Sequence, residues 1–167
     1  MDCISTRLPY RQTGAFSKIA LDYIDQDARL KPFIANPPTL RGFEKAIEQR
    51  KTFSTNRDIL VTALKKQYAA HNPHEAVSRN IDALASSNSF TITTAHQNNL
   101  FTGPLYFIYK ILHVIRLSEY LTSSMPSYKF IPVFYMGTED ADLDELNHIY
   151  LDKEKLVWQT RQTGAVG

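Results

Sequence analysis

The 167-residue sequence has a single cysteine, Cys3, so no disulfide can form within it, and this scarcity favours a cytoplasmic location. It has no apolar run long enough for a membrane span. Its 19 basic and 17 acidic residues leave a net charge of only +2, so no bulk field attracts nucleic acids or acidic membranes. With 43% apolar and 22% charged residues, the composition is that of a soluble globular protein with a real core.

Familiar short motifs are missing as well. The sequence contains no GxGxxG, no Walker phosphate-binding loop, no CxxC pair and no HExxH. The dense acidic run at residues 139–145 lacks the glycine and terminal glutamate that an EF-hand calcium loop requires. We therefore assign no metal ligands from these patterns.

The first half of the sequence, residues 1–88, is predicted to be a helical lead-in. Residues 1–14 are predicted to be extended, and residues 25–38 to be a loop broken by prolines. Caps and apolar spacing predict helices at residues 16–24, 40–50, about 55–70 and about 72–85. The last of these has Asn72 as its expected cap and Pro73 at its first position. No cluster of reactive side chains stands out here, so we interpret these helices as packing layers.

Residues 89–148 are the segment around which the chain is organised. The β-branched run 90–95 predicts a buried strand, and the apolar run 130–136 predicts a second one. Between them, apolar residues recur at helical spacing from residue 105 to about 121: Leu105, Ile108, Leu112 and Ile115. Thr102 or Gly103 is the expected cap of this helix, with Pro104 as its first residue.

This order of strand, helix and strand predicts a parallel β-α-β unit with a right-handed crossover. The loops after the two strands, 96–103 and 137–144, then lie at the same carboxyl edge, where open α/β sheets bind ligands. Residues 149–151 and 156–159 predict a hairpin. Because a parallel sheet usually has more than two strands, we expect this sequence to be the front part of a longer protein.

The first loop supplies candidates for binding an anion and for moving a proton. His96 can act as acid, base or phosphate donor near neutral pH, although a histidine bonded to the loop backbone has the same signature. Thr102 and Gly103 indicate either an ordinary helix start or an anion site. Tyr106 and Lys110 are four residues apart on the early helix, so Lys110 either reaches back to an anion or extends into solvent.

The second loop carries five carboxylates between residues 139 and 145. Such a density of like charges usually marks a solvated face. Here, however, the acids follow a strand directly, so Glu139, Asp140 and Asp142 are expected to converge on one ligand. Metal binding, amine recognition and general-base catalysis stay open from the residues alone. Asn147 and His148 lie one turn further on and complete the expected pocket.

Two long motifs then resemble a known family. Residues 94–106 read Thr-Ala-His-Gln-Asn-Asn-Leu-Phe-Thr-Gly-Pro-Leu-Tyr, and with Lys110 they resemble a signature of the bacillithiol biosynthesis cysteine-adding enzymes, the BshC family. Residues 132–148, with Gly-Thr-Glu-Asp-Ala-Asp-Leu-Asp-Glu at their centre, resemble a second one. The resemblance covers nearly the whole chain. It implies a Rossmann-like core and an added coiled-coil region, in members longer than this chain.

The expected fold class is therefore α/β, with a Rossmann-like parallel β-α-β core and a helical N-terminal lead-in. Residues 1–167 would be the N-terminal part of one catalytic domain, and thus an incomplete domain. Residues 1–88 would form the lead-in, and residues 89–167 the β-α-β unit with the hairpin.

The resemblance also implies a function, since the family is assigned to joining cysteine to glucosaminyl malate by an amide bond in the last step of bacillithiol biosynthesis. It implies a cysteine ligase with these two substrates, ATP as the candidate activator, and a homodimer of the full-length protein as the candidate assembly. The catalytic candidates are His96, Glu139, Asp140 and Asp142. The substrate- and anion-binding candidates are Gln97, Asn98, Thr102, Gly103, Tyr106, Lys110, Asn147 and His148. We expect the first loop to meet phosphate or malate, and the acids to bind the amine or accept its proton.

Two positions depart from the commoner family pattern. That pattern has Gly-Gln-Gln where this chain has Ala95-His96-Gln97, and a histidine where this chain has Ala141. His96 is a candidate to take over part of the lost histidine's role. Two other functions stay open. One is a nucleotidyl-transfer enzyme of similar topology that binds ATP with the first loop. The other is a non-catalytic relative of the family that acts as a binding or scaffold module.

Overall fold

The computed structural model describes residues 4–163, without the side chain of Asp140. Cys3 lies outside the described residues. The chain divides into two compact units, Met1–Thr55 and Asn56–Gly167. The division falls within the predicted lead-in, and all the candidate site residues belong to the second unit.

The first unit is built from α1 (Tyr10–Thr13), α2 (Lys18–Ile24), η1 (Ala28–Phe33) and α3 (Leu40–Lys51). Ser17 caps α2 and Thr39 caps α3, each accepting a hydrogen bond from the backbone N–H three residues on. These two helices confirm the predicted ones. α1 lies where the sequence predicted extended chain, and η1 lies where it predicted a loop. Both are too short to show a helical period in the sequence.

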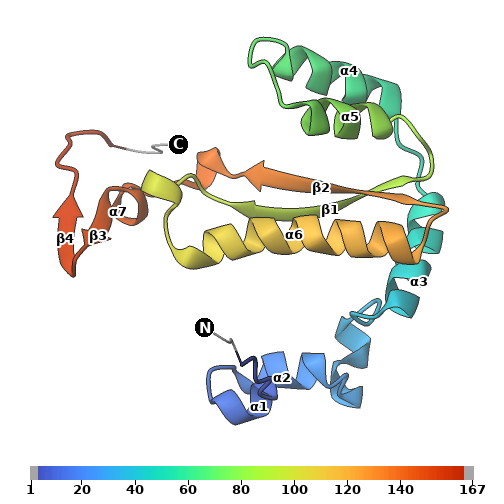
Figure 1. Cartoon of the computed structure of the whole chain (residues 1–167), viewed down its shortest axis with the longest axis horizontal. Helices are drawn as coiled ribbons and strands as arrows, with labels where there is room; N and C mark the ends of the chain where they lie inside the picture. The colour runs from blue at the N-terminus through green and yellow to red at the C-terminus, as the bar shows by residue number, and fades with distance from the viewer. Residues whose placement is uncertain (1–3, 164–167) are drawn as a thin grey trace. The chain divides into compact units, whose positions relative to one another are not determined.

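The second unit contains a parallel pair of strands joined by a long helix. In chain order it comprises α4 (Arg57–Tyr68), α5 (Glu75–Ala83), β1 (Ser89–His96), η2 (Leu100–Thr102), α6 (Leu105–Ser124), β2 (Lys129–Met136), η3 (Thr138–Asp140), α7 (Leu143–Leu146), β3 (His148–Leu151) and β4 (Glu154–Val157). β1 and β2 pair in parallel, from Ser89 opposite Lys129 to His96 opposite Met136. Figure 1 shows α6 along one face of this sheet and α4 with α5 on the other. The predicted β-α-β unit is confirmed.

A hydrophobic core lies between α4, α5 and the sheet. It is formed by Val61, Ile81, Leu84 and Ile131, with Leu64, Tyr68, Val77, Ala83 and Val133 packed against it. In α5, Ile81 is buried and Val77 is half-buried, whereas Ile59 and Leu60 of α4 are exposed. α5 is capped by His74 rather than Asn72, because Asn72 adopts left-handed backbone with a φ of +43°.

Alternate strand residues face α6 and bring His96 to that side of the sheet. Phe134 of β2 packs against Phe107 of α6 with ring centroids 5.3 Å apart, and it lies opposite Thr94 of β1. Because side chains alternate along a strand, His96 points to the same face as Thr94. Its ring centroid lies 5.6 Å from that of Phe107. The strand pattern therefore places His96 under the start of α6, at the carboxyl edge.

Apolar spacing alone indicates the wrong face of α6. The four side chains expected from the spacing are 36% to 66% exposed: Leu105, Ile108, Leu112 and Ile115. The buried stripe instead contains Val114, Ser118 and Leu121. α6 is apolar on two faces, so its periodicity cannot choose between them. β1 is likewise half-buried rather than buried, since Thr91, Thr93 and Ala95 are exposed on one side.

The start of α6 also differs from the prediction. The helix begins at Leu105, Pro104 is its N-cap residue, and no side chain caps it. Thr102 and Gly103 cannot cap it because they belong to a left-handed turn that precedes the helix. The early N–H groups of α6 therefore face the loop without a side-chain acceptor at the cap.

The predicted hairpin is present in the second unit. β3 and β4 pair antiparallel, with Ile149 opposite Leu156. The turn consists of Asp152 and Lys153, whose φ values of +47° and +74° fit a two-residue turn with both central residues left-handed. The predicted strands, 149–151 and 156–159, left four residues for the turn. The turn has only two, so β4 begins earlier than predicted, at Glu154.

Arg57 ties the helices of the second unit to β1. Its Nη1 donates to the carbonyl oxygen of Leu84 and to the hydroxyl of Ser89, both at 2.9 Å. Its Nη2 donates to the Ser89 carbonyl oxygen at 3.0 Å. Ser89 is only 1% exposed, so water has little access to its polar atoms.

We expect Arg57→Lys to destabilise this unit by about 2 kcal/mol. The planar guanidinium of arginine donates to all three acceptors at once, and the lysine ammonium group cannot reproduce this geometry. The measurement is amide hydrogen exchange of β1 in the full-length protein. Arg79→Lys, in an exposed pair with Glu75, is the control and should cost less than about 0.5 kcal/mol. Equal protection of β1 in Arg57→Lys and wild type would contradict the account.

Candidate active site at the carboxyl edge of the sheet

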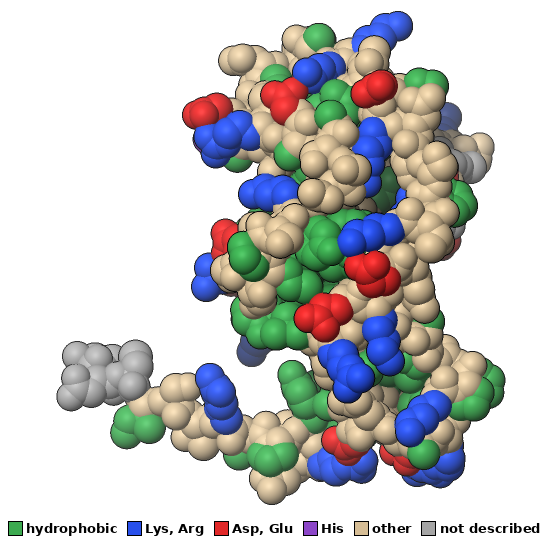
Figure 2. Space-filling model, turned by 90° about the vertical axis from the view of Figure 1, so that its right-hand side faces the viewer, with side chains coloured by type: hydrophobic (Ala, Val, Ile, Leu, Met, Phe, Trp, Pro, Cys, Tyr) green, Lys and Arg blue, Asp and Glu red, His purple; other side chains and the backbone are tan. Residues whose placement is uncertain are grey.

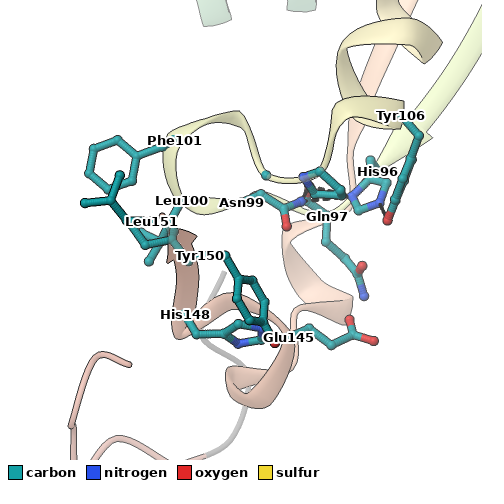
Figure 3. Close-up of a pocket in the computed structure, with 13 residues that line it drawn as sticks. His96, Gln97, Asn99, Leu100, Phe101, Tyr106, Glu145, His148, Tyr150 and Leu151 are labelled. Atoms are coloured by element: carbon teal, nitrogen blue, oxygen red, sulfur yellow. Dashed lines mark hydrogen bonds between the residues drawn. The ribbon is translucent and has the colours of Figure 1, made fainter. Parts of the chain in front are cut away.

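A pocket of about 880 Å³ opens beyond the carboxyl ends of β1 and β2. One wall comes from residues within 96–106, and the other from Glu145 and residues 148–151. In Figure 3, His96 and Tyr106 lie at one end, and Leu100, Phe101 and Leu151 lie at the other. Segments that follow the two strands therefore meet at one edge, and the pocket has a polar end and an apolar end.

His96 lies at the polar end with both ring nitrogens in contact with partners. Its Nε2 lies 2.8 Å from the Tyr106 hydroxyl, and its Nδ1 lies 3.0 Å from the Gln97 carbonyl oxygen. The Asn99 amide nitrogen is 3.1 Å from the same Nδ1. If Nδ1 carries the proton it donates to Gln97, and Nε2 then accepts from Tyr106. In the other tautomer Asn99 donates to Nδ1, and Nε2 donates to Tyr106.

Gly103 makes room for Asn99. The Asn99 amide also donates to the Gln97 carbonyl oxygen at 3.1 Å. A Cβ added to Gly103 would lie 2.6 Å from both Cβ and Cγ of Asn99. The Gly103 backbone, at φ +61° and ψ −148°, adopts a region that is essentially restricted to glycine. Both the space and the backbone therefore require glycine here, and Asn99 stays beside His96 as a result.

The turn before α6 contains unusual backbone. Phe101 and Thr102 have φ values of +48° and +71°, directly before Gly103. Left-handed backbone is unfavourable for such residues and clusters at functional loops. Phe101 is 82% exposed and lines the pocket, whereas Thr102 is exposed without lining it. The anion-binding role of Thr102 stays a prediction.

Lys110 folds back toward the first loop. Its Nζ donates to the Ala95 carbonyl oxygen at 3.3 Å and lies 5.4 Å from the centroid of the Tyr106 ring. The side chain thus reaches back to the loop backbone although it is exposed, and its binding of an anion stays a prediction. The side chain does not line the pocket, but it brings a positive charge close to the polar end.

The acidic loop divides between two environments. Glu139 accepts a hydrogen bond from the Tyr135 hydroxyl at 2.6 Å, and Asp142 is the exposed N-cap residue of α7. Neither lines the pocket, and the side chain of Asp140 is not described. The acid that does line it is Glu145, whose carboxylate points toward the Gln97 side chain in Figure 3. Glu145 was one of five similar acids in the sequence, and only the position of α7 distinguishes it.

The Tyr135 hydroxyl lowers the pKa of Glu139, helped by a backbone hydrogen bond, and the Glu139 carboxylate raises the pKa of Tyr135. Because the folded pKa of Glu139 lies below its ordinary 4.5, its contribution to stability is present above that pH and is lost as pH falls through the folded pKa. We expect Tyr135→Phe to raise the pKa of Glu139 toward 4.5, measured by NMR titration of its carboxyl carbon. Tyr120→Phe, on an exposed part of α6, is the control. An unchanged Glu139 titration in Tyr135→Phe would contradict this reading.

The other predicted residues occupy the hairpin side or the loop interior. His148 lines the pocket, and its Nδ1 lies 3.1 Å from the Asn147 side-chain oxygen. The Asn147 carbonyl oxygen accepts from the Trp158 backbone N–H at 2.6 Å, which holds the end of the hairpin. Asn98 does not line the pocket, and among the described contacts its buried side-chain oxygen has no hydrogen-bond partner.

Sequence reasoning missed several pocket residues besides Glu145. Asn99 belongs to the polar loop that it identified, but nothing local distinguished Asn99 from its neighbours. Ile149, Tyr150 and Leu151 were recognised as a strand, yet their approach to the first loop is a tertiary contact without a sequence signal. The apolar end of the pocket was therefore not predicted.

The charge on the surface, the hydropathy of the helices and the grouping of possible metal ligands bear on what kind of site this is. On the face shown in Figure 2, acidic side chains lie among the more numerous basic ones, so the basic side chains do not form a continuous patch. Across residues 4–163, no helix combines the length and apolar character needed to cross a membrane. Within the same described range, no three histidine, cysteine, aspartate or glutamate side chains gather as a metal site would require.

The model of a protein family described as "Bacillithiol biosynthesis BshC, N-terminal Rossmann-like domain" matches residues 1–167. The chain belongs to the BshC family. The Rossmann-like α/β class that the resemblance implied is thereby confirmed for this member of the BshC family. The pocket is lined by residues of both sequence motifs on which that resemblance rested.

Curated BshC relatives agree over most of the chain. It is 46% identical over 168 residues to a protein of Flavobacterium johnsoniae and 45% identical over 161 residues to one of Cytophaga hutchinsonii. A relative from Bacillus thuringiensis is 30% identical over 142 residues. All three are named "Putative cysteine ligase BshC". The matches cover 99%, 96% and 85% of this chain, but only 31%, 31% and 26% of those relatives.

Proposed function

We propose that the chain is the N-terminal part of a ligase that joins the carboxyl group of cysteine to the amine of glucosaminyl malate, in bacillithiol biosynthesis. The observation that carries the proposal is the pocket at the carboxyl edge. Its polar end combines an imidazole–phenol pair with a nearby lysine, and a carboxylate lies on the opposite wall. The names of the BshC relatives support the cysteine-ligase reading.

Amide formation needs an activated carboxyl group, and a nucleoside triphosphate such as ATP is the co-substrate that we propose for it. The start of α6 fits a phosphate group or the malate carboxylates. Gly103 has no side chain to obstruct an anion, the first N–H groups of a helix lack intrahelical acceptors, and Lys110 brings a positive charge nearby. Gln97 and Tyr106 add polar groups to the same end of the pocket.

The amine substrate has different requirements, because it must be held near the activated carboxyl and must lose a proton. We assign the binding of its ammonium form to Glu145, the carboxylate that lines the pocket. His96 is the base on which we propose that the proton lost in the reaction is held. Glu139, Asp140 and Asp142, the catalytic candidates from the sequence, remain as alternatives to Glu145, and single variants separate the two assignments.

The test is to incubate the full-length protein with cysteine, glucosaminyl malate and ATP, and to detect the amide product by mass spectrometry. We expect product only when all three compounds are present, and much less from His96→Ala. Release of pyrophosphate from ATP without the glucosaminyl malate acceptor would favour the nucleotidyl-transfer alternative. If none of the three compounds raises the midpoint temperature of thermal unfolding, a non-catalytic scaffold would be favoured.

A further inference from the structure

We infer that the hydroxyl group of Tyr106, rather than His96 itself, receives the proton from the attacking amine and passes its own proton to His96. The inference rests on the proposed function and names a further catalytic residue for it. It follows from how the two side chains are placed relative to the pocket and to each other.

His96 has no nitrogen that faces the pocket unpartnered. Its Nδ1 lies against the Gln97 carbonyl oxygen and the Asn99 amide, and its Nε2 lies 2.8 Å from the Tyr106 hydroxyl. The Tyr106 and Phe107 rings also pack against the imidazole, with centroids 5.2 Å and 5.6 Å from its own. Both side chains line the pocket, but His96 is partly buried, whereas Tyr106 is 51% exposed. A substrate therefore meets the phenol oxygen before it can reach Nε2.

The hydrogen-bond directions suit a relay through this oxygen. The Gln97 carbonyl oxygen can only accept, so it stabilises the tautomer that carries the proton on Nδ1. The Asn99 amide, which lies 3.1 Å from both groups, then donates to this carbonyl oxygen and not to Nδ1. Nε2 is then basic and accepts the hydrogen of the Tyr106 hydroxyl. With its hydrogen directed at Nε2, the phenol oxygen presents its lone pairs as an acceptor for a substrate N–H. Lys110, 5.4 Å from the ring centroid, stabilises negative charge that develops on the phenol.

The relay gives a balanced amide-forming step. The ammonium group bound by Glu145 first loses one proton to solvent. The neutral amine nitrogen then attacks the carbonyl carbon of the activated cysteine, and a C–N bond forms. The C–O bond to the phosphate-type leaving group, which derives from the nucleoside triphosphate, breaks, and the leaving group takes the electron pair. The amine proton moves to the Tyr106 oxygen as the hydroxyl proton of Tyr106 moves to Nε2. The products are the amide, the released phosphate group and a His96 imidazolium, which returns its proton to solvent.

The decisive variant is Tyr106→Phe in the full-length protein, assayed for amide formation as a function of pH. We expect kcat to fall by about 100-fold or more, with KM little changed, because proton transfer to a positioned group contributes about 10²- to 10⁴-fold. Tyr109→Phe is the matched control, since it makes the same change on the same helix at a 64% exposed side chain that does not line the pocket. Its kcat should equal that of wild type.

The pH profile separates the relay from a purely structural role. In wild type, kcat should rise with pH where the relay limits the rate, and both Tyr106→Phe and His96→Gln should lose this pH dependence. The double variant should be no slower than the slower single variant, because the two residues act as one unit. If Tyr106 merely positions the imidazole, Tyr106→Phe keeps this pH dependence, and that result would overturn the inference.

Two further outcomes keep the inference distinct from the proposed function. If wild type makes the amide and Tyr106→Phe is as fast as Tyr109→Phe, the relay fails and the proposed function stands. If wild type makes no amide, both fail together. Should Tyr106→Phe not fold, 3-fluorotyrosine at position 106 keeps the size but changes the acidity. The relay then requires a several-fold change in kcat that the same replacement at position 109 does not produce, and equal rates would refute it.

Discussion

Glu145→Gln in the full-length protein is expected to raise KM for the amine substrate by roughly 10- to 100-fold. The carboxylate lines the pocket from α7, and Figure 3 shows it directed toward the Gln97 side chain across the cavity. A hydrogen bond to a charged group contributes about 1.5–3 kcal/mol, which corresponds to that range of affinity. Glutamine keeps the shape of the side chain and removes the charge, so the fold should be unaffected.

The matched control is Asp144→Asn, which neutralises the neighbouring exposed acid on α7 without altering the pocket lining. Steady-state kinetics should give wild-type values for it. Glu139→Gln provides the comparison with the assignment made from the sequence, since Glu139 is engaged with Tyr135 instead. A larger loss in Glu139→Gln than in Glu145→Gln would reverse the assignment of the amine-binding acid.

Gly103→Ala should be at least as damaging, with a fall in kcat of about 100-fold. The new Cβ would overlap Asn99, and the backbone conformation of residue 103 is one that costs a non-glycine residue about 1–3 kcal/mol. The loop must shift to accommodate the methyl group. Asn99 then leaves His96 and the Gln97 carbonyl oxygen, so the orientation of the imidazole is lost.

Gly14→Ala is the matched control for this change. Gly14 also has a positive φ, of +65°, but nothing lies within 4 Å of an added Cβ. It should incur only the backbone strain and keep full activity. The double variant Asn99→Gly/Gly103→Ala relieves the overlap with both Cβ and Cγ of Asn99 but still leaves His96 without its amide neighbour, so its activity should stay low. Near-normal turnover of Gly103→Ala would show that the loop geometry is not needed for the chemistry.

The parts of the fold that the sequence predicted are those set by local patterns. The β-branched run before His96 and the apolar run before Gly137 identified the two strands, and a helix of sufficient length between them required a parallel pairing. The hairpin was likewise visible as two short strands around Asp152 and Lys153. Because the loops that follow parallel strands must share an edge, the location of the pocket was predictable too.

The parts that failed depend on tertiary contacts. α6 carries apolar side chains on two faces, and only the sheet selects the one with Val114 and Leu121. The acidic loop gave no reason to prefer Glu145 to Glu139, because that choice depends on where α7 begins and on the Tyr135 hydroxyl. The pairing of His96 with Tyr106 crosses from the strand to the helix, and residue spacing alone does not reveal it.

The most direct test of the proposed cysteine-ligase function is a profile of low-molecular-weight thiols and their precursors, by mass spectrometry, in the host after deletion of the gene for the full-length protein. The account predicts that bacillithiol disappears and glucosaminyl malate accumulates. Both changes should be reversed by the wild-type gene and not by one that encodes Tyr106→Phe. Unchanged levels of both compounds in the deletion strain would contradict it.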